Sequence, residues 1–148
     1  MNIEDVKKLR QETGAGITDC KKIYENAGEN YEKALKILKS KAAETAKKKS
    51  ARKTKAGIVD SYIHGNGKVG VLMRVECETD FVAKNEKFKM AIHDIAMHIV
   101  AMSPSGEEEL FSQQFVKNPE ITVKDFLNDL IAKMGENIKI DQFIRFEI

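Results

Sequence analysis

Histidine, cysteine and paired carboxylates are the residue types that most often carry chemistry, and this chain holds them at spacings that do not suit catalysis or metal binding. Of its three histidines, His93 and His98 lie five residues apart, whereas two metal ligands on one helix face lie about four apart. We expect both to be surface or half-buried helix residues. Cys77 has no histidine near it in the sequence, so we interpret it as a small buried residue and not as a nucleophile.

Three carboxylates, Glu76, Glu78 and Asp80, alternate along the chain. On an extended backbone they would share one face and could bind a cation, but no further oxygen ligands lie near them in the sequence. The alternative is that the three carboxylates lie on a solvated face, bind no cation and only repel one another. The glycines form neither a phosphate-binding loop nor a dinucleotide fingerprint. The sequence therefore predicts neither an enzyme nor a bound cofactor or metal.

The segment from Thr79 to Asn85 connects a strand-like run at 68–75 to a helical pattern that begins near residue 86. Connections of this kind lie on protein surfaces and hold many binding residues. In the middle of this polar turn is Phe81, which has two interpretations. It is either a core residue that begins the following helix, or an exposed aromatic anchor beside a carboxylate, as in the hot spots of protein interfaces.

Three short amphipathic helices are expected before residue 40. Apolar residues recur at helical spacing from Ile3, and the first helix should end at Gly14, which permits a left-handed exit. Thr18 or Asp19 can cap the second helix, and the third should begin near Asn30. A unit of this size has only a small core.

Lysine and arginine dominate residues 39–55, where they surround alanines and a single acid, Glu44. Alanine and lysine favour a helix, but no wide apolar face is present. One interpretation of this segment is a solvated helical or frayed linker. The other is an electrostatic contact for a partner or for RNA. No aromatic residue lies among the lysines, which counts against stacking on a single strand.

From residue 56 the pattern becomes strand-like, and two strands flank the sequence His-Gly-Asn-Gly at 64–67, which is typical of a tight hairpin turn. After the hairpin we expect a helix at 85–102 and then a stretch at 107–115 that is either a short helix or irregular. Pro119 should interrupt regular secondary structure. A helix capped by Thr122 and a strand at 138–148 follow. The order β-β-α-α-β predicts an α+β fold, with an antiparallel sheet of three strands and helices on one face. The last strand leaves an edge for pairing, so we expect a homodimer through the sheet.

The chain has 148 residues and a formal net charge of +2, which is too small to indicate nucleic-acid binding by the whole protein. Its start lacks the pattern of a secretory signal, and no apolar run approaches the roughly 20 residues that cross a bilayer. Two cysteines far apart in the sequence are typical of a reducing compartment. We therefore expect a cytoplasmic protein without a membrane partner.

The polar turn also carries a family resemblance. Its residues Thr79-Asp80-Phe81-Val82-Ala83-Lys84-Asn85 resemble the signature of bacterial and organellar elongation factor Ts. Further segments agree with that family, in the same order, along nearly the whole chain: Val6-Lys7-Lys8-Leu9-Arg10, Thr13-Gly14-Ala15-Gly16, Asp19-Cys20-Lys21-Lys22, Phe115-Val116-Lys117, Thr122-Val123, Gly135-Glu136-Asn137-Ile138 and Phe143-Ile144-Arg145-Phe146-Glu147.

This resemblance implies an N-terminal domain of three helices at 1–40, similar to ubiquitin-associated domains. It further implies a basic linker at 41–55 and an α+β dimerisation core at 56–148. One departure concerns the segment between Met102 and Phe115, which is usually longer in the family. The chain thus resembles the short members, which carry one copy of the core and act as dimers.

The resemblance also implies a function, which is guanine nucleotide exchange on elongation factor Tu during translation. The partner is expected in its GDP-bound and nucleotide-free forms. Thr79, Asp80, Phe81 and Val82 match the family's turn that dislodges magnesium from the partner's nucleotide site, and Asp80 and Phe81 match its intruding residues. Ile17, which follows the glycine turn, is the expected secondary contact. The alternative is an RNA-binding module that uses residues 39–55, although a nucleic-acid partner is not expected.

Overall fold

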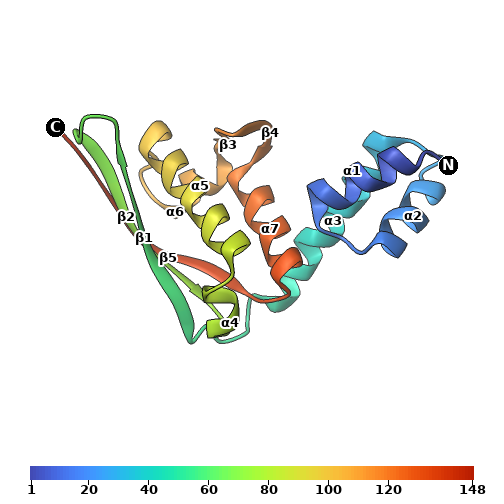
Figure 1. Ribbon diagram of the computed structural model, residues 1–148, viewed down its shortest axis with the longest axis horizontal. Coiled ribbons are helices and arrows are strands. Elements are labelled where there is room, and N and C mark those ends of the chain that lie inside the picture. The colour runs from blue at the N-terminus through green and yellow to red at the C-terminus, as the bar shows by residue number, and fades with distance from the viewer.

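The first fifty residues fold into three helices because their apolar residues repeat at helical spacing between turns that contain glycine. The computed structural model describes residues 1–148, and its helices α1 (Ile3–Thr13), α2 (Ile17–Asn26) and α3 (Tyr31–Lys49) pack together at the N-terminal end (Figure 1). We call residues 1–40 the N-terminal unit. Its core consists of seven buried side chains: Val6, Leu9, Cys20, Ile23, Tyr24, Ala34 and Leu38.

The helix α2 begins one to two residues earlier than its expected caps. Its N-cap position is Gly16, which has no side chain to bond the helix, so Thr18 and Asp19 both lie in the first turn. Asp19 there places a negative charge at the positive end of the helix. The helix α3 begins beside Asn30 as predicted, and Asn30 caps it, since its side chain accepts a hydrogen bond from the backbone N–H of Lys33.

The helix α3 continues past residue 40 without a break and ends at Lys49. Ala42 and Ala46 are buried in this extension, and α3 packs against α7 (Val123–Met134) of the core. Residues 41–49 are thus helical, which is one of the two forms expected for the linker, and the helix is packed on one side through Ala42 and Ala46 while most of its other residues are exposed. The alanines alone do not form a wide apolar face, so the sequence did not predict this packing. Their small side chains nevertheless let two helices approach closely.

The predicted antiparallel sheet of three strands is confirmed. Its strands are β1 (Ala56–His64), β2 (Val69–Cys77) and β5 (Ile138–Glu147), in the spatial order β1-β2-β5. In the expected hairpin turn between β1 and β2, Gly65 and Gly67 both have positive φ. The central strand β2 is hydrogen-bonded on both sides, and it ends directly before the polar turn. The sheet therefore gives this turn a fixed base.

Helices cover one face of the sheet, as expected for this α+β fold (Figure 1). The helix α5 (Glu86–Met102) crosses β1 and β2, and α7 packs against α5 and against the short α6 (Glu107–Ser112). Fully buried apolar side chains at every third or fourth position of α5 pack onto the sheet: Phe88, Ile92, Ile95 and Ile99. None of the helices has the length and apolar character that a membrane crossing requires.

Two short strands, β3 (Gln114–Phe115) and β4 (Asn118–Thr122), form a small separate sheet that the sequence did not reveal. Pro119 was expected to break the chain but lies inside β4. A two-stranded ladder leaves one side of each strand unpaired, and proline is tolerated on such edges. The ambiguous stretch before β3 is resolved as α6.

His98 is fully buried, which corrects the expectation of a surface or half-buried residue. Its ring joins α5 to the β3–β4 segment, since Nε2 lies 2.9 Å from Gln113 Oε1 and Nδ1 accepts from the backbone N–H of Val116 at 3.1 Å. Because that N–H can only donate, Nδ1 is unprotonated and Nε2 carries the proton. Burial lowers the pKa of His98, which favours this neutral form of the ring.

Candidate functional site

The polar turn after β2 is built around a one-turn helix, α4 (Asp80–Ala83). Thr79 is its N-cap, with its hydroxyl accepting a hydrogen bond from the Val82 N–H at 3.4 Å. Asn85 then caps α5 by accepting from the backbone N–H of Lys87 and of Phe88. Thr79 and Asn85 are both polar because they cap helices, which explains why this stretch of seven residues is polar although it contains helical turns.

Phe81 projects from α4 into solvent and is 83% exposed. The interpretation of Phe81 as a core residue is therefore wrong. The apolar positions that anchor α4 are its neighbours Val82 and Ala83, which are buried in the main core at 4% and 5% exposure. Asp80 is exposed beside Phe81. The turn thus presents one aromatic ring and one carboxylate on a base that is fixed in the core.

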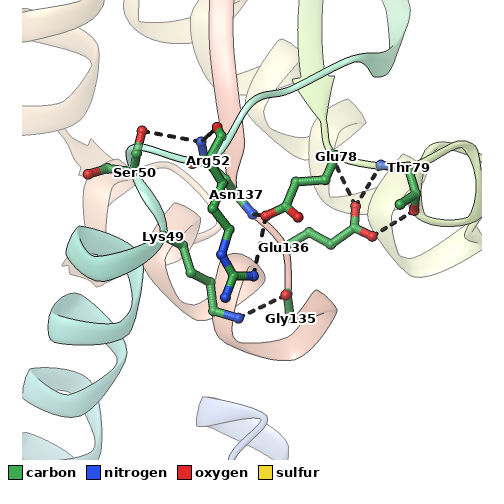
Figure 2. A network of polar contacts seen from close by, with 8 residues as sticks. All are labelled: Lys49, Ser50, Arg52, Glu78, Thr79, Gly135, Glu136 and Asn137. Carbon is green, nitrogen blue, oxygen red and sulfur yellow. Dashed lines mark hydrogen bonds and ion pairs between the residues drawn. The ribbon is translucent and has the colours of Figure 1, made fainter.

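A carboxylate from another part of the chain holds this turn from the side. Figure 2 shows Glu136, in the loop between α7 and β5, reaching Glu78 and Thr79. Glu136 Oε1 accepts from the backbone N–H of Glu78 at 3.1 Å and from that of Thr79 at 3.0 Å. Its Oε2 accepts from the Thr79 hydroxyl at 2.6 Å. Three donors to one ionised group make a strong set of hydrogen bonds.

Glu78 returns a similar contact, since its carboxylate accepts from the backbone N–H of Asn137 at 2.8 Å. It also lies 3.6 Å from the guanidinium of Arg52. The Asn137 side chain, which is buried, donates to the carbonyl of Arg52 at 2.9 Å, and Lys49 donates to the carbonyl of Gly135 at 2.8 Å. The end of α3, the loop after α7 and the polar turn therefore form one network (Figure 2).

The alternating acids do not converge on one point. Glu76 accepts from the Thr54 hydroxyl at 3.0 Å, Glu78 is engaged by Asn137, and Asp80 lies on α4. No group of three or more histidine, cysteine or acidic side chains is placed to hold a metal ion. Cys77 is fully buried, as predicted, and burial raises the pKa of its thiol, which keeps it protonated and unreactive.

Ile17 lies at the first position of α2 and is 41% exposed. It lines a cleft of about 840 Å³ between the N-terminal unit and the core, and Asn85 at the end of the polar turn lines the same cleft. The structure thus places Ile17 and the end of the polar turn on the same cleft. Four basic side chains and no acidic one complete the lining: Lys7, Arg10, Lys87 and Lys133.

The supporting residues Glu136, Asn137 and Arg52 were not identified as site residues from the sequence. Residues 135–137 lie in one of the segments that match the family, but nothing in the sequence connects them to the polar turn, because their contacts with residues 78–79 span more than fifty positions. No local pattern reports such a contact.

Comparison with known proteins gives a consistent family. The family model described as Elongation factor TS matches residues 78–148, beginning at the turn. Elongation factor Ts of Carboxydothermus hydrogenoformans is 40% identical over 188 aligned positions, covering 97% of this chain and 87% of the relative. The protein of the same name from Thermotoga petrophila is 38% identical over 191 positions, covering 100% of this chain and 96% of the relative. Because these alignments are longer than the 148-residue chain, both relatives contain residues that it lacks.

Proposed function

The chain belongs to the elongation factor Ts family, which makes it a translation elongation factor, and from this premise we propose that it is a guanine nucleotide exchange factor for elongation factor Tu. It binds the GDP-bound partner, weakens the hold of the magnesium and phosphate site on GDP, and releases the nucleotide-free partner when GTP binds. It makes and breaks no covalent bond in this role.

The observation that carries the proposal is the exposed Phe81 on a fixed base. An aromatic ring with 83% exposure is unfavourable in water, and it gains free energy when a partner buries it. Full burial of a phenylalanine contributes roughly 1.5–3 kcal/mol. A thousandfold faster release requires about 4 kcal/mol. Phe81 alone therefore does not account for such an acceleration, and we assign the remainder to Asp80.

Asp80 can act on the magnesium ion of the partner. Mg²⁺ demands near-octahedral coordination by oxygen ligands, so a small displacement of its surroundings weakens its contacts with protein and phosphate together. A carboxylate beside an inserted aromatic ring competes for the same ion. The turn would act as a wedge at this site, with Thr79 and Val82 holding the wedge in shape.

The N-terminal unit supplies affinity for the partner. The cleft beside Ile17 carries four basic side chains and no acidic one, which suits an acidic surface and favours encounter by electrostatic attraction. Contacts that are equally strong before and during release do not accelerate it. The coupling is also reciprocal, so that bound GDP must weaken the binding of this protein as much as this protein weakens the binding of GDP.

The test is the release of a fluorescent GDP analogue from purified elongation factor Tu at increasing concentrations of this protein. We expect Phe81→Ala to lower the maximal release rate by roughly ten- to a hundredfold while the free energy of unfolding stays unchanged. Val116→Ala is a matched control, since Val116 is exposed and apolar but lies on the distant β3–β4 segment. An unchanged release rate with Phe81→Ala would refute the role of the turn.

We also propose that the protein forms a homodimer through the uncovered face of its sheet. The face opposite the helices carries apolar side chains in cross-strand rows, with Ile63 and Phe146 flanking Gly70, and Ile144 beside Leu72. All four side chains are exposed, Phe146 by 74%. A second copy of the same sheet fits this patch because packing two such faces removes both from water. We therefore propose a dimer contact on the sheet face, in place of the pairing along the sheet edge that the sequence suggested.

The rival function is RNA binding through residues 39–55. The extension of α3 weakens this alternative, since Ala42 and Ala46 are buried, α3 packs against α7, and Lys49 donates a hydrogen bond to the carbonyl of Gly135. A measurable RNA affinity that falls steeply with salt, together with an absence of GDP release, would favour the rival.

A further inference from the structure

The helix α4 is too short to be stable on its own. Starting a helix fixes several residues for one hydrogen bond, which is unfavourable until more turns follow, and α4 has only four residues. Its shape therefore depends on contacts from outside. The burial of Val82 and Ala83 is one such contact, and the Thr79 cap is the other.

The cap depends in turn on Glu136. A threonine hydroxyl has a single proton, and in Thr79 this proton is donated to Glu136 Oε2 at 2.6 Å. The oxygen then has its lone pairs free to accept the Val82 N–H. Glu136 Oε1 meanwhile fixes the backbone of Glu78 and Thr79 through their N–H groups. One carboxylate thus sets both the rotamer of the cap and the direction in which the chain leaves β2.

We propose that Glu136 is a positioning residue for nucleotide exchange, holding α4 so that Asp80 and Phe81 are already in the inserting arrangement before the partner binds. This inference rests on the proposed function of the turn. Preorganisation of this kind lowers the barrier because the partner does not have to order the wedge. Glu136 itself lies beside the turn and does not have to touch the partner.

The same loop fixes the turn relative to α3. Asn137, next to Glu136, donates its backbone N–H to Glu78 and its side-chain N–H groups to the carbonyls of Arg52 and Ser50. Asn137 is 2% exposed, so these bonds are shielded from water. The loop after α7 therefore links the wedge to the chain that leaves the N-terminal unit, and the two contact regions keep a defined spacing.

The experiment compares Glu136→Ala and Glu136→Gln in the fluorescent GDP release assay. We expect Glu136→Ala to lower the maximal release rate roughly tenfold while the concentration for half-maximal release changes less than about threefold, because the affinity contacts lie elsewhere. Glu136→Gln keeps one acceptor oxygen and the side-chain shape, so it should retain an intermediate rate. Glu120→Ala, which removes an exposed carboxylate from β4, is the matched control and should leave the rate unchanged.

Hydrogen exchange provides a readout that a general loss of stability would not give. In Glu136→Ala the amides of Thr79 and Val82 should exchange faster, while the amides in the centre of β2 keep their protection. If Glu136→Ala unfolds the protein, amide exchange at Thr79 and Val82 is compared with that in the centre of β2 in Glu136→Gln instead. Unchanged amide protection at Thr79 and Val82 in a folded variant overturns the proposal.

A double mutant separates this inference from the function on which it rests. If Glu136 acts through Phe81 and Asp80, then adding Glu136→Ala to Phe81→Ala should cause a smaller further loss of the maximal rate than Glu136→Ala causes in the wild-type protein. Full additivity contradicts the positioning role. If Phe81→Ala alone leaves release unchanged, the proposed function of the turn fails. If Phe81→Ala slows release but Glu136→Ala does not, only the positioning role fails.

Discussion

Asp129 carries a carboxylate into the contact between α7 and the N-terminal unit, where it is only 7% exposed. Loss of water around the carboxylate raises its pKa to about 7, against the partial opposition of Lys133 on α7 and Lys39 on α3. Asp125 on α7 and Glu12 on α1 raise the pKa further through repulsion. This residue thus has a charge that the fold disfavours at neutral pH.

The change Asp129→Asn removes that charge and should stabilise the protein at neutral and alkaline pH. The folded state binds the Asp129 proton more tightly than the unfolded chain, whose value is near 3.8, so stability is lost as the pH rises from about 4 through about 7. The gain from Asp129→Asn should be on the order of 1–3 kcal/mol at pH 8 and should shrink toward zero near pH 4.

Urea unfolding at pH 4.5 and at pH 8 measures this difference. Asp19→Asn, which alters an exposed aspartate in the first turn of α2, is the control and should change the free energy of unfolding by less than about 1 kcal/mol. The same gain from Asp129→Asn at both pH values would show that the carboxylate is not held protonated by the fold.

At the scale of the elements, periodicity and capping residues predicted most of what the structure contains. Thr122 caps α7 through a capping box with Asp125, and such a signal is local enough to be recognised in the sequence. The β3–β4 pair was missed because its strands are too short for alternation to show, and Pro119 argued against them. The sequence could not decide whether Phe81 is buried or exposed, because the four residues of α4 are too few to show which side of a helix is apolar. The contact with Glu136 could not be predicted, since it depends on how distant elements pack.

Gly14, which ends α1, lies where the N-terminal unit contacts α7 of the core, and its replacement tests that contact. It has φ of 69°, and a side chain there would overlap the side chain of Lys133 at the end of α7. Lys133 also lies 3.5 Å from the carbonyl of Gln11. We therefore expect Gly14→Ala to lower the free energy of unfolding by more than the roughly 1–3 kcal/mol that a left-handed conformation alone costs a non-glycine residue.

Gly28→Ala is the matched control for this prediction. Gly28 has the same φ of 69° but open space around it, so its replacement should reveal the conformational cost without the overlap. Denaturant unfolding of the two variants gives the comparison. Equal losses would mean that the contact between Gly14 and Lys133 contributes nothing to the docking of the two units.

At the scale of the whole molecule, the uncovered sheet face predicts the oligomeric state. Leu72 lies in the middle of that face on the central strand and is 54% exposed. Leu72→Asp should convert a dimer into a monomer, because packing two sheet faces would bury an unpaired charge on each copy. Sedimentation velocity at micromolar concentrations measures this. Val116→Asp, a similar change on the β3–β4 segment, should leave the dimer intact, and a wild-type protein that stays monomeric at high micromolar concentration contradicts the proposal.

The continuous helix α3 has a consequence for how a partner is chosen. It runs from the N-terminal unit to its packing against α7, so that in the proposed complex Ile17 and Phe81 would act as the two ends of a bivalent ligand with a stiff spacer. Once one end is bound, the effective concentration of the other at its own site is set by geometry and not by diffusion. A stiff spacer gives high avidity when its length matches the distance between the two sites on the partner. When the two distances differ, both ends cannot bind at once and the avidity is lost. Selectivity among related nucleotide-binding proteins would then depend on the distance between two sites as much as on the residues within either one.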